Sequence, residues 1–157
     1  MRIAILSNAS ADSPGGAGRI AATYTALLLD ERGHEVRSWG PRSSFKQLDA
    51  MDAFTRLFFH LSDFGAQLTV VKEVKAWKPD VLLTHNLTGC GFMTPRVLRD
   101  SGIRWVHVLH DVQLVEPSGQ IIEGESFHQF RTVWRWFWSG LRQSATKEPD
   151  AVVSPTK

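Results

Sequence analysis

A polar, glycine-rich stretch between a short apolar run and a helical pattern constrains this chain most. Ile3 to Leu6 is typical of a buried strand, SNASADSPGGAGR occupies Ser7 to Arg19, and apolar residues then recur at helical spacing as far as Arg32. In open α/β sheets such loops lie at the carboxyl ends of the strands, where ligands bind. Glycines let the backbone approach a ligand, and the next helix presents free N–H groups to an anion. We expect an anion site here; a turn that only connects the two elements is the alternative.

The residues around the glycines argue against two common kinds of nucleotide site. Gly16 to Ala21 fits the dinucleotide pattern G-x-G-x-x-A. However, about eight residues separate the strand end from the first glycine, whereas that fingerprint needs a tight turn. The second predicted strand, Glu35–Trp39, is followed by Gly40 and has no acidic residue to hold a ribose. No lysine follows the glycines, which excludes a P-loop nucleotide site.

Strand and helix patterns alternate along the rest of the chain. The predicted strands are 2–7, 35–39, 81–84, 103–109 and 151–154, and the predicted helices are 17–32, about 52–77 with a break near 63–65, 94–100 and 127–144. This order predicts an α/β, Rossmann-like three-layer α/β/α domain with a mostly parallel sheet. The expected core-facing helix residues are Ile20, Tyr24, Leu27 and Leu28 in the first helix, and Phe54, Leu57, Phe58, Leu61, Val70, Val71, Val74 and Trp77 in the second. For the second helix, contact with a lipid or a partner is the alternative.

Composition limits the function classes. The 157 residues are 43% hydrophobic and 22% charged, which are globular values, and we treat residues 1–157 as a single domain. A net charge of +2 argues against a nucleic-acid partner. The single cysteine, Cys90, cannot form an intrachain disulfide, and the N-terminal apolar segment is too short for a signal peptide. We expect a cytoplasmic protein, with the inner face of a membrane as an alternative location.

Two histidines follow predicted strands. His85 and Asn86 come after the strand 81–84, and His110 and Asp111 come after the strand 103–109. The carboxyl ends of these strands lie on the ligand side of a parallel sheet, so His110 and Asp111 are candidate site residues. The alternative for His110 is a local hydrogen bond at a strand end. His107 lies inside its strand and is predicted to be a core or interface residue facing away from His110.

The predicted helix 127–144, FHQFRTVWRWFWSGLRQS, combines aromatic residues with three arginines. A basic, aromatic amphipathic helix can lie on an anionic membrane or dock on another domain. Trp134, Trp136 and Trp138 cannot all face one core, so membrane contact, partner contact and a partly exposed core helix all remain open. Self-association through this helix is a further expectation.

Several short motifs together resemble glycosyltransferase family 4, a group with the GT-B architecture. The resemblance rests on the PGG loop, on RGHEV at 32–36, on KPDVLLTHN at 78–86, on HD at 110–111 and on PDAVVSPT at 149–156. It covers nearly the whole chain, and the order and spacing of the motifs carry it. It implies one Rossmann-like half of a GT-B enzyme, whose C-terminal donor-binding domain, with its E-x7-E motif, is absent from these residues.

The resemblance also implies roles for individual residues. Gly15 and Gly16 match the glycines whose amides approach the diphosphate of a nucleotide sugar, with Gly18 and Arg19 beside them. His110 matches a histidine that contacts the donor sugar, and Asp111 orients it or meets the acceptor hydroxyl. The acceptor side is lined by His85 and Asn86.

The implied reaction is retaining transfer of a sugar to a glycan or lipid-linked acceptor, with no metal and no cofactor beyond the nucleotide-sugar substrate. Activity needs a C-terminal domain or a partner chain. The alternatives are a non-catalytic assembly module that uses the aromatic helix, and a stand-alone flavodoxin-like or nucleotide-binding domain. A stand-alone nucleotide-binding domain is disfavoured, because the sequence lacks both the carboxylate that would hold a ribose and the lysine that would bind a phosphate.

Overall fold

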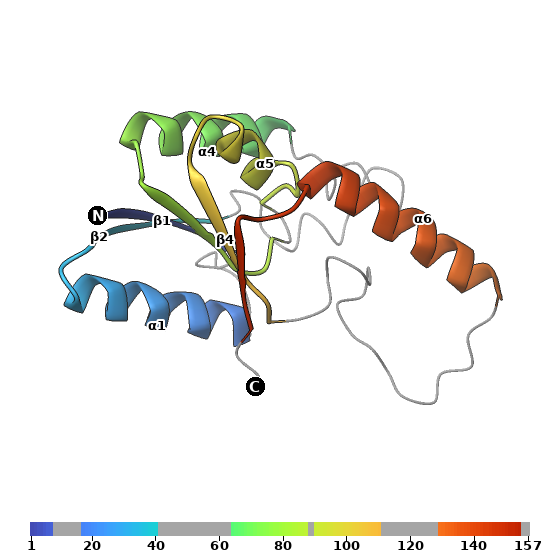
Figure 1. The fold of residues 1–157 in the computed structure, drawn as a ribbon, viewed down its shortest axis with the longest axis horizontal. Coiled ribbons are helices and arrows are strands. Elements are labelled where there is room, and N and C mark those ends of the chain that lie inside the picture. Colours follow the sequence, from blue (N-terminus) through green and yellow to red (C-terminus); the bar gives the residue numbers. More distant parts are fainter. Residues whose placement is uncertain (8–16, 41–63, 88–89, 111–128, 155–157) are drawn as a thin grey trace.

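The fold is a parallel sheet with helices on both faces. The computed structural model describes residues 1–7, 17–40, 64–87, 90–110 and 129–154 (Figure 1). The strands are β1 (Arg2–Leu6), β2 (Glu35–Trp39), β3 (Val81–Thr84), β4 (Arg104–Val108) and β5 (Ala151–Val153). The helices are α1 (Ala17–Glu31), α4 (Phe64–Trp77), α5 (Thr94–Arg99) and α6 (Gln129–Thr146). The strand order is β2-β1-β3-β4-β5 with every pairing parallel, which confirms the predicted Rossmann-like α/β class.

Alternation along β1 divides the core into two layers. Ala4 and Leu6 point into a cluster with α4 and α5, whereas Ile3 and Ile5 point into a smaller cluster with α1. Figure 1 shows α4 and α5 on one face of the sheet and α1 on the other. The predicted stripe of α4 is confirmed, because all four members are buried: Val70, Val71, Val74 and Trp77. The stripe predicted between Phe54 and Leu61 lies outside the described residues.

The predicted core face of α1 is wrong. Tyr24, Leu27 and Leu28 are 63%, 55% and 55% exposed, and the side chain of Ile20 is outside the described set. The helix instead packs through Ala22, with Ala26 and Leu29 partly buried beside it. These three positions also recur at helical spacing. The face of α1 that packs on the sheet therefore carries two alanines and Leu29 in place of the larger side chains that the sequence suggested.

Two glycines with positive φ follow the ends of helices. Gly33 has φ +77°, and Gly102 has φ +89°, a region that L side chains rarely adopt. After α1, the Gly33 N–H donates to Asp30 O at 2.8 Å and His34 N–H donates to Leu29 O at 3.1 Å. This pair of bonds is a Schellman motif, which satisfies the last carbonyls of the helix and turns the chain toward β2.

A Pro-Asp pair precedes β3 and another precedes β5, and both aspartates make the same contacts. Asp80 accepts a hydrogen bond from the backbone N–H of Arg2 at 2.7 Å, and its own N–H donates to Arg2 O at 2.9 Å. Asp150 makes the equivalent pair with Trp105, at 2.8 and 2.9 Å. We call this four-atom contact the Pro-Asp clasp. It fixes the register of each strand against its neighbour, so the motifs KPD and EPD have a structural role at the amino edge of the sheet.

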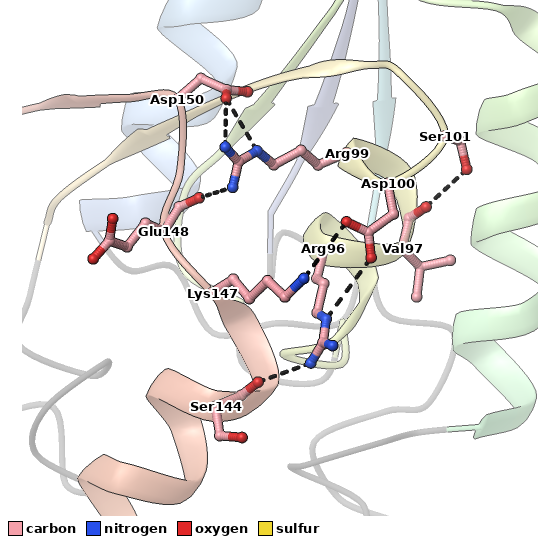
Figure 2. A network of polar contacts seen from close by, with 9 residues as sticks. All are labelled: Arg96, Val97, Arg99, Asp100, Ser101, Ser144, Lys147, Glu148 and Asp150. Atoms are coloured by element: carbon pink, nitrogen blue, oxygen red, sulfur yellow. Dashed lines mark hydrogen bonds and ion pairs between the residues drawn. The ribbon is translucent and has the colours of Figure 1, made fainter.

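The clasp at Asp150 belongs to a polar network that joins α5, the end of α6 and β5 (Figure 2). Arg99 pairs with the Asp150 carboxylate at 2.9 Å and donates to Glu148 O at 2.6 Å. Arg96 donates to Ser144 O at 2.9 Å. The backbone N–H of Trp105, followed by the Arg99 guanidinium, lowers the pKa of Asp150. The network ties the last strand to the body of the domain.

Helix α6 extends away from the sheet beyond this anchored end (Figure 1). Trp136 is 79% exposed and Phe137 is 50% exposed, so this aromatic part of the helix is open to solvent in the described structure. The helix runs two residues later than predicted at each end. Within the described residues, no helix combines the length and the apolar character needed to cross a bilayer.

Candidate functional site

The carboxyl edge of the sheet brings the predicted site elements together. β1 pairs with β2 on one side and with β3 on the other, so the direction of the strand order reverses between β1 and β3. Ligands of open α/β folds bind outside the carboxyl ends of strands at such a switch point. α1 runs back against the strands, and its N-terminus therefore lies at the same edge (Figure 1).

The glycine loop leaves the sheet at this edge. Gly15 and Gly16 lie outside the described residues, while Gly18 and Arg19 are in the first turn of α1. Ser7, which begins the loop, is held at both ends: its N–H donates to Trp39 O at 3.1 Å, and its carbonyl accepts from the thiol of Cys90 at 3.2 Å. The buried thiol thus holds the start of the loop, a contact that sequence analysis did not anticipate.

The most specific feature of the edge is a pair of histidines. The Nδ1 atom of His85 lies 2.7 Å from the Nε2 atom of His110, although 25 residues separate them in sequence. His85 follows β3 directly, and its backbone N–H continues the ladder by donating to Leu6 O at 3.0 Å. His110 follows β4, the neighbouring strand, and is half-buried. The structure therefore brings together two of the predicted site residues, while Asp111 lies outside the described residues.

His85 is fully buried, at 0% exposure. Burial, followed by the nearby charges of His110 and His107, lowers the pKa of His85 from 6.5 to about 4. The side chain is therefore neutral at physiological pH. Its second ring nitrogen, Nε2, is buried and has no hydrogen-bond partner among the described residues. The side chain of His85 is covered and contacts His110 through Nδ1, and its predicted acceptor contact stays a prediction.

A buried polar triad supports the strands beneath the pair. The indole N–H of Trp105 donates to Thr84 Oγ1 at 2.8 Å, and the same oxygen lies 2.7 Å from Nδ1 of His107. All three side chains are at most 5% exposed, which confirms His107 as a core residue. A threonine and a histidine inside otherwise apolar strands were the sequence signal for this triad. It fixes β3 against β4 one residue before His85.

The comparison with protein families decides what kind of domain this is. The family model described as Glycosyltransferase Family 4 matches residues 14–157. The chain belongs to glycosyltransferase family 4. No curated protein and no solved structure matches the chain.

The family 4 match covers all the motifs that suggested it, from the glycine loop to the last strand. The roles predicted for Asn86, Arg19 and the glycines remain predictions, as does a reaction without metal. In the described ranges, no three His, Cys, Asp or Glu side chains gather as a potential metal site.

Proposed function

We propose that this family 4 domain is the acceptor-side half of a retaining, nucleotide-sugar-dependent glycosyltransferase. It transfers a sugar to a glycan or lipid-linked acceptor and works together with a C-terminal donor-binding domain or partner chain. The observation that carries the proposal is the convergence of the His85–His110 pair and the N-terminus of α1 at the carboxyl edge of the sheet. In a glycosyltransferase-family domain, this edge offers an anion site beside a side chain that can contact a sugar.

Each predicted residue has a role in this proposal. Main-chain amides of Gly15 and Gly16, with Gly18 and Arg19 at the start of α1, stabilise the negative charge of the departing diphosphate. His110 contacts the donor sugar near the reacting carbon. Asp111 orients His110 or meets the acceptor hydroxyl, and Asn86, next to His85, lines the acceptor side. No metal and no cofactor takes part; the nucleotide sugar is a substrate.

The test is a transfer assay with UDP- and GDP-sugars in which the protein is supplied with its donor-binding domain or partner chain. Calorimetric titration with the same nucleotides, with and without the partner, accompanies it. We expect transfer only when both parts are present, and we expect His110→Ala to abolish it. His34→Ala is the matched control, because His34 lies after α1 at the opposite edge of the sheet. Tight nucleotide binding by this chain alone would contradict the proposal and support a stand-alone nucleotide-binding domain.

A second candidate function is supported by the aromatic surface of α6. Trp136 and Phe137 are exposed, and the helix sequence contains three arginines and no acidic residue. This combination suits contact with an anionic membrane surface or docking on a catalytic partner. Flotation with vesicles of anionic and of zwitterionic lipid tests the membrane contact. If it holds, only the anionic vesicles carry the protein, and Trp136→Ser weakens that binding. Exposed Leu28→Ser, on α1, is the matched control.

A further inference from the structure

The hydrogen bond between the two histidines has a direction, and that direction determines what His110 can do. We propose that His85 is a positioning residue. It donates a hydrogen bond from its Nδ1–H to Nε2 of His110 and so holds His110 as the neutral tautomer with its proton on Nδ1. The significance of this tautomer for sugar transfer rests on the proposed function; its existence does not.

The geometry of the pair is that of one well-aligned hydrogen bond. The two nitrogens are 2.7 Å apart, the ring centroids are 5.0 Å apart, and the ring planes differ by 9°. The centroid separation equals the N···N distance plus the radius of each ring, so the rings lie edge to edge and nearly in one plane. A proton on either nitrogen then points straight at the lone pair of the other, as a strong N–H···N bond requires.

Only one proton can lie between these nitrogens, and His85 carries a single ring proton. Burial keeps His85 neutral at physiological pH, since its pKa is lowered to about 4. A neutral imidazole has one N–H donor and one bare nitrogen. Two arrangements are therefore available. Either His85 donates from Nδ1 and its Nε2 is bare, or Nε2 of His85 carries the proton and Nδ1 accepts one from His110.

The unpaired Nε2 atom of His85 distinguishes these two proton arrangements. Nε2 of His85 is buried without a hydrogen-bond partner among the described residues. A buried N–H donor left unpaired is rarer in proteins than an unpaired acceptor. The arrangement with a bare Nε2 avoids a buried, unpaired donor. His85 therefore donates from Nδ1, and Nε2 of His110 is the acceptor.

The consequence for His110 follows directly. With Nε2 occupied as an acceptor, a neutral His110 carries its proton on Nδ1 and offers that N–H to a ligand. It cannot also take up a proton on Nε2 unless His85 first changes its own tautomer, because two N–H groups would then face each other at 2.7 Å. His110 is thereby fixed as a hydrogen-bond donor to a sugar oxygen, and it does not act as a general base through Nε2.

The tautomer can be observed without any ligand or activity. We would label the protein with 15N-histidine and record long-range 1H–15N spectra near pH 7.5, where an N–H nitrogen and a bare nitrogen are well separated. The His110→Gln and His85→Asn variants assign the two rings by the signals they remove. We expect Nδ1–H with a bare Nε2 for both rings. A proton on Nε2 of His110 in the unmodified protein would overturn the proposal.

Two replacements of His85 supply the matched test. Leu removes the donor, so His110 should revert to the Nε2–H tautomer that free histidine prefers. Asn keeps an N–H close to the position of Nδ1, so His110 should remain in the Nδ1–H form. If the tautomer of His110 is the same in His85→Leu as in the unmodified protein, His85 does not set it.

The activity readout is separate. If the proposed function is correct, kcat in the transfer assay should fall about tenfold in His85→Leu and recover in His85→Asn. Absence of all transfer, with the tautomers as expected, would reject the proposed function and leave the positioning role intact. If the tautomers are as expected but kcat in His85→Leu equals that of the unmodified protein, the positioning role of His85 in transfer is overturned.

Discussion

The buried histidine should make the protein lose stability as the pH falls. The pKa of His85 is 6.5 in an unfolded chain and about 4 in the folded one. Between these two pH values His85 is protonated in the unfolded chain but not in the folded chain. Protons therefore favour unfolding in this window, and the free energy of unfolding falls as the pH is lowered from about 6.5 toward 4. Above pH 6.5 the contribution is fully present.

The size of the effect follows from the same two values. Each unit of pKa difference corresponds to about 1.36 kcal/mol, so the complete loss below pH 4 is about 3 kcal/mol. Between pH 7.5 and 5 the linkage relation gives a loss of about 2 kcal/mol from His85. For a domain with a total stability of about 5 to 15 kcal/mol this is a large fraction. His110 and His107 lie close to His85, so the effect of His85 is measured as a difference between two proteins.

Urea denaturation followed by tryptophan fluorescence, repeated from pH 7.5 to 4.5, measures it. His85→Asn retains a donor toward His110 and does not titrate, so its stability should fall about 2 kcal/mol less than that of the unmodified protein between pH 7.5 and 5. His34→Asn controls for the removal of a histidine elsewhere. If the curves for His85→Asn and the unmodified protein run parallel, the buried, neutral state of His85 is refuted.

Three further predictions follow from the fold. Leu29→Ala should lower the free energy of unfolding by about 2 kcal/mol in the same urea assay, and the neighbouring Leu28→Ala by less than about 0.5 kcal/mol. The reason is that, of these two side chains, only Leu29 packs on the sheet. Equal losses would reject the corrected face of α1. Gly33→Ala should destabilise the protein by about 1 kcal/mol because of the positive φ of Gly33, whereas Gly140→Ala in α6 should stabilise the protein slightly. Thermal unfolding compares the two variants. A Gly33→Ala variant as stable as the unmodified protein argues against the Schellman turn. Asp150→Asn should speed hydrogen exchange in β5 and leave β1 unchanged, since it weakens the clasp on Trp105 and the ion pair with Arg99 but not the clasp on Arg2. Unchanged exchange in β5 contradicts that role.

The order of elements and the parallel sheet could be predicted because strand patterns, several of them short apolar runs, alternate with helical patterns between turn signals. The face of α1 could not. Leu27, Leu28 and Leu29 are consecutive, so they spread over more than one side of a helix, and periodicity alone does not choose between the sides. The choice depends on how the helix packs on the sheet, which is a property of the folded structure and places Ala22, Ala26 and Leu29 against it.

The location of the candidate site could be predicted from the sequence, but its side-chain contacts could not. That His85 and His110 share an edge follows from their positions after two strands, and the parallel topology then makes them neighbours. Their direct bond did not follow, because it depends on side-chain rotamers and on the burial of His85. The triad of Thr84, Trp105 and His107 was missed because a hydroxyl in a strand has many partners available to it, and only the register of β3 on β4 selects these two.

The Pro-Asp clasps have a consequence for how such a domain can change. They act at the amino ends of β3 and β5, whereas the histidines stand beyond the carboxyl ends of β3 and β4. The residues that hold the strands in register and the two histidines of the candidate site are thus separated by the length of a strand. If the proposed function is correct, substrate preference can therefore diverge at one edge of the sheet while the other edge keeps the strands aligned. A library that randomises residues around His110 and keeps both Pro-Asp pairs should contain a high share of folded members.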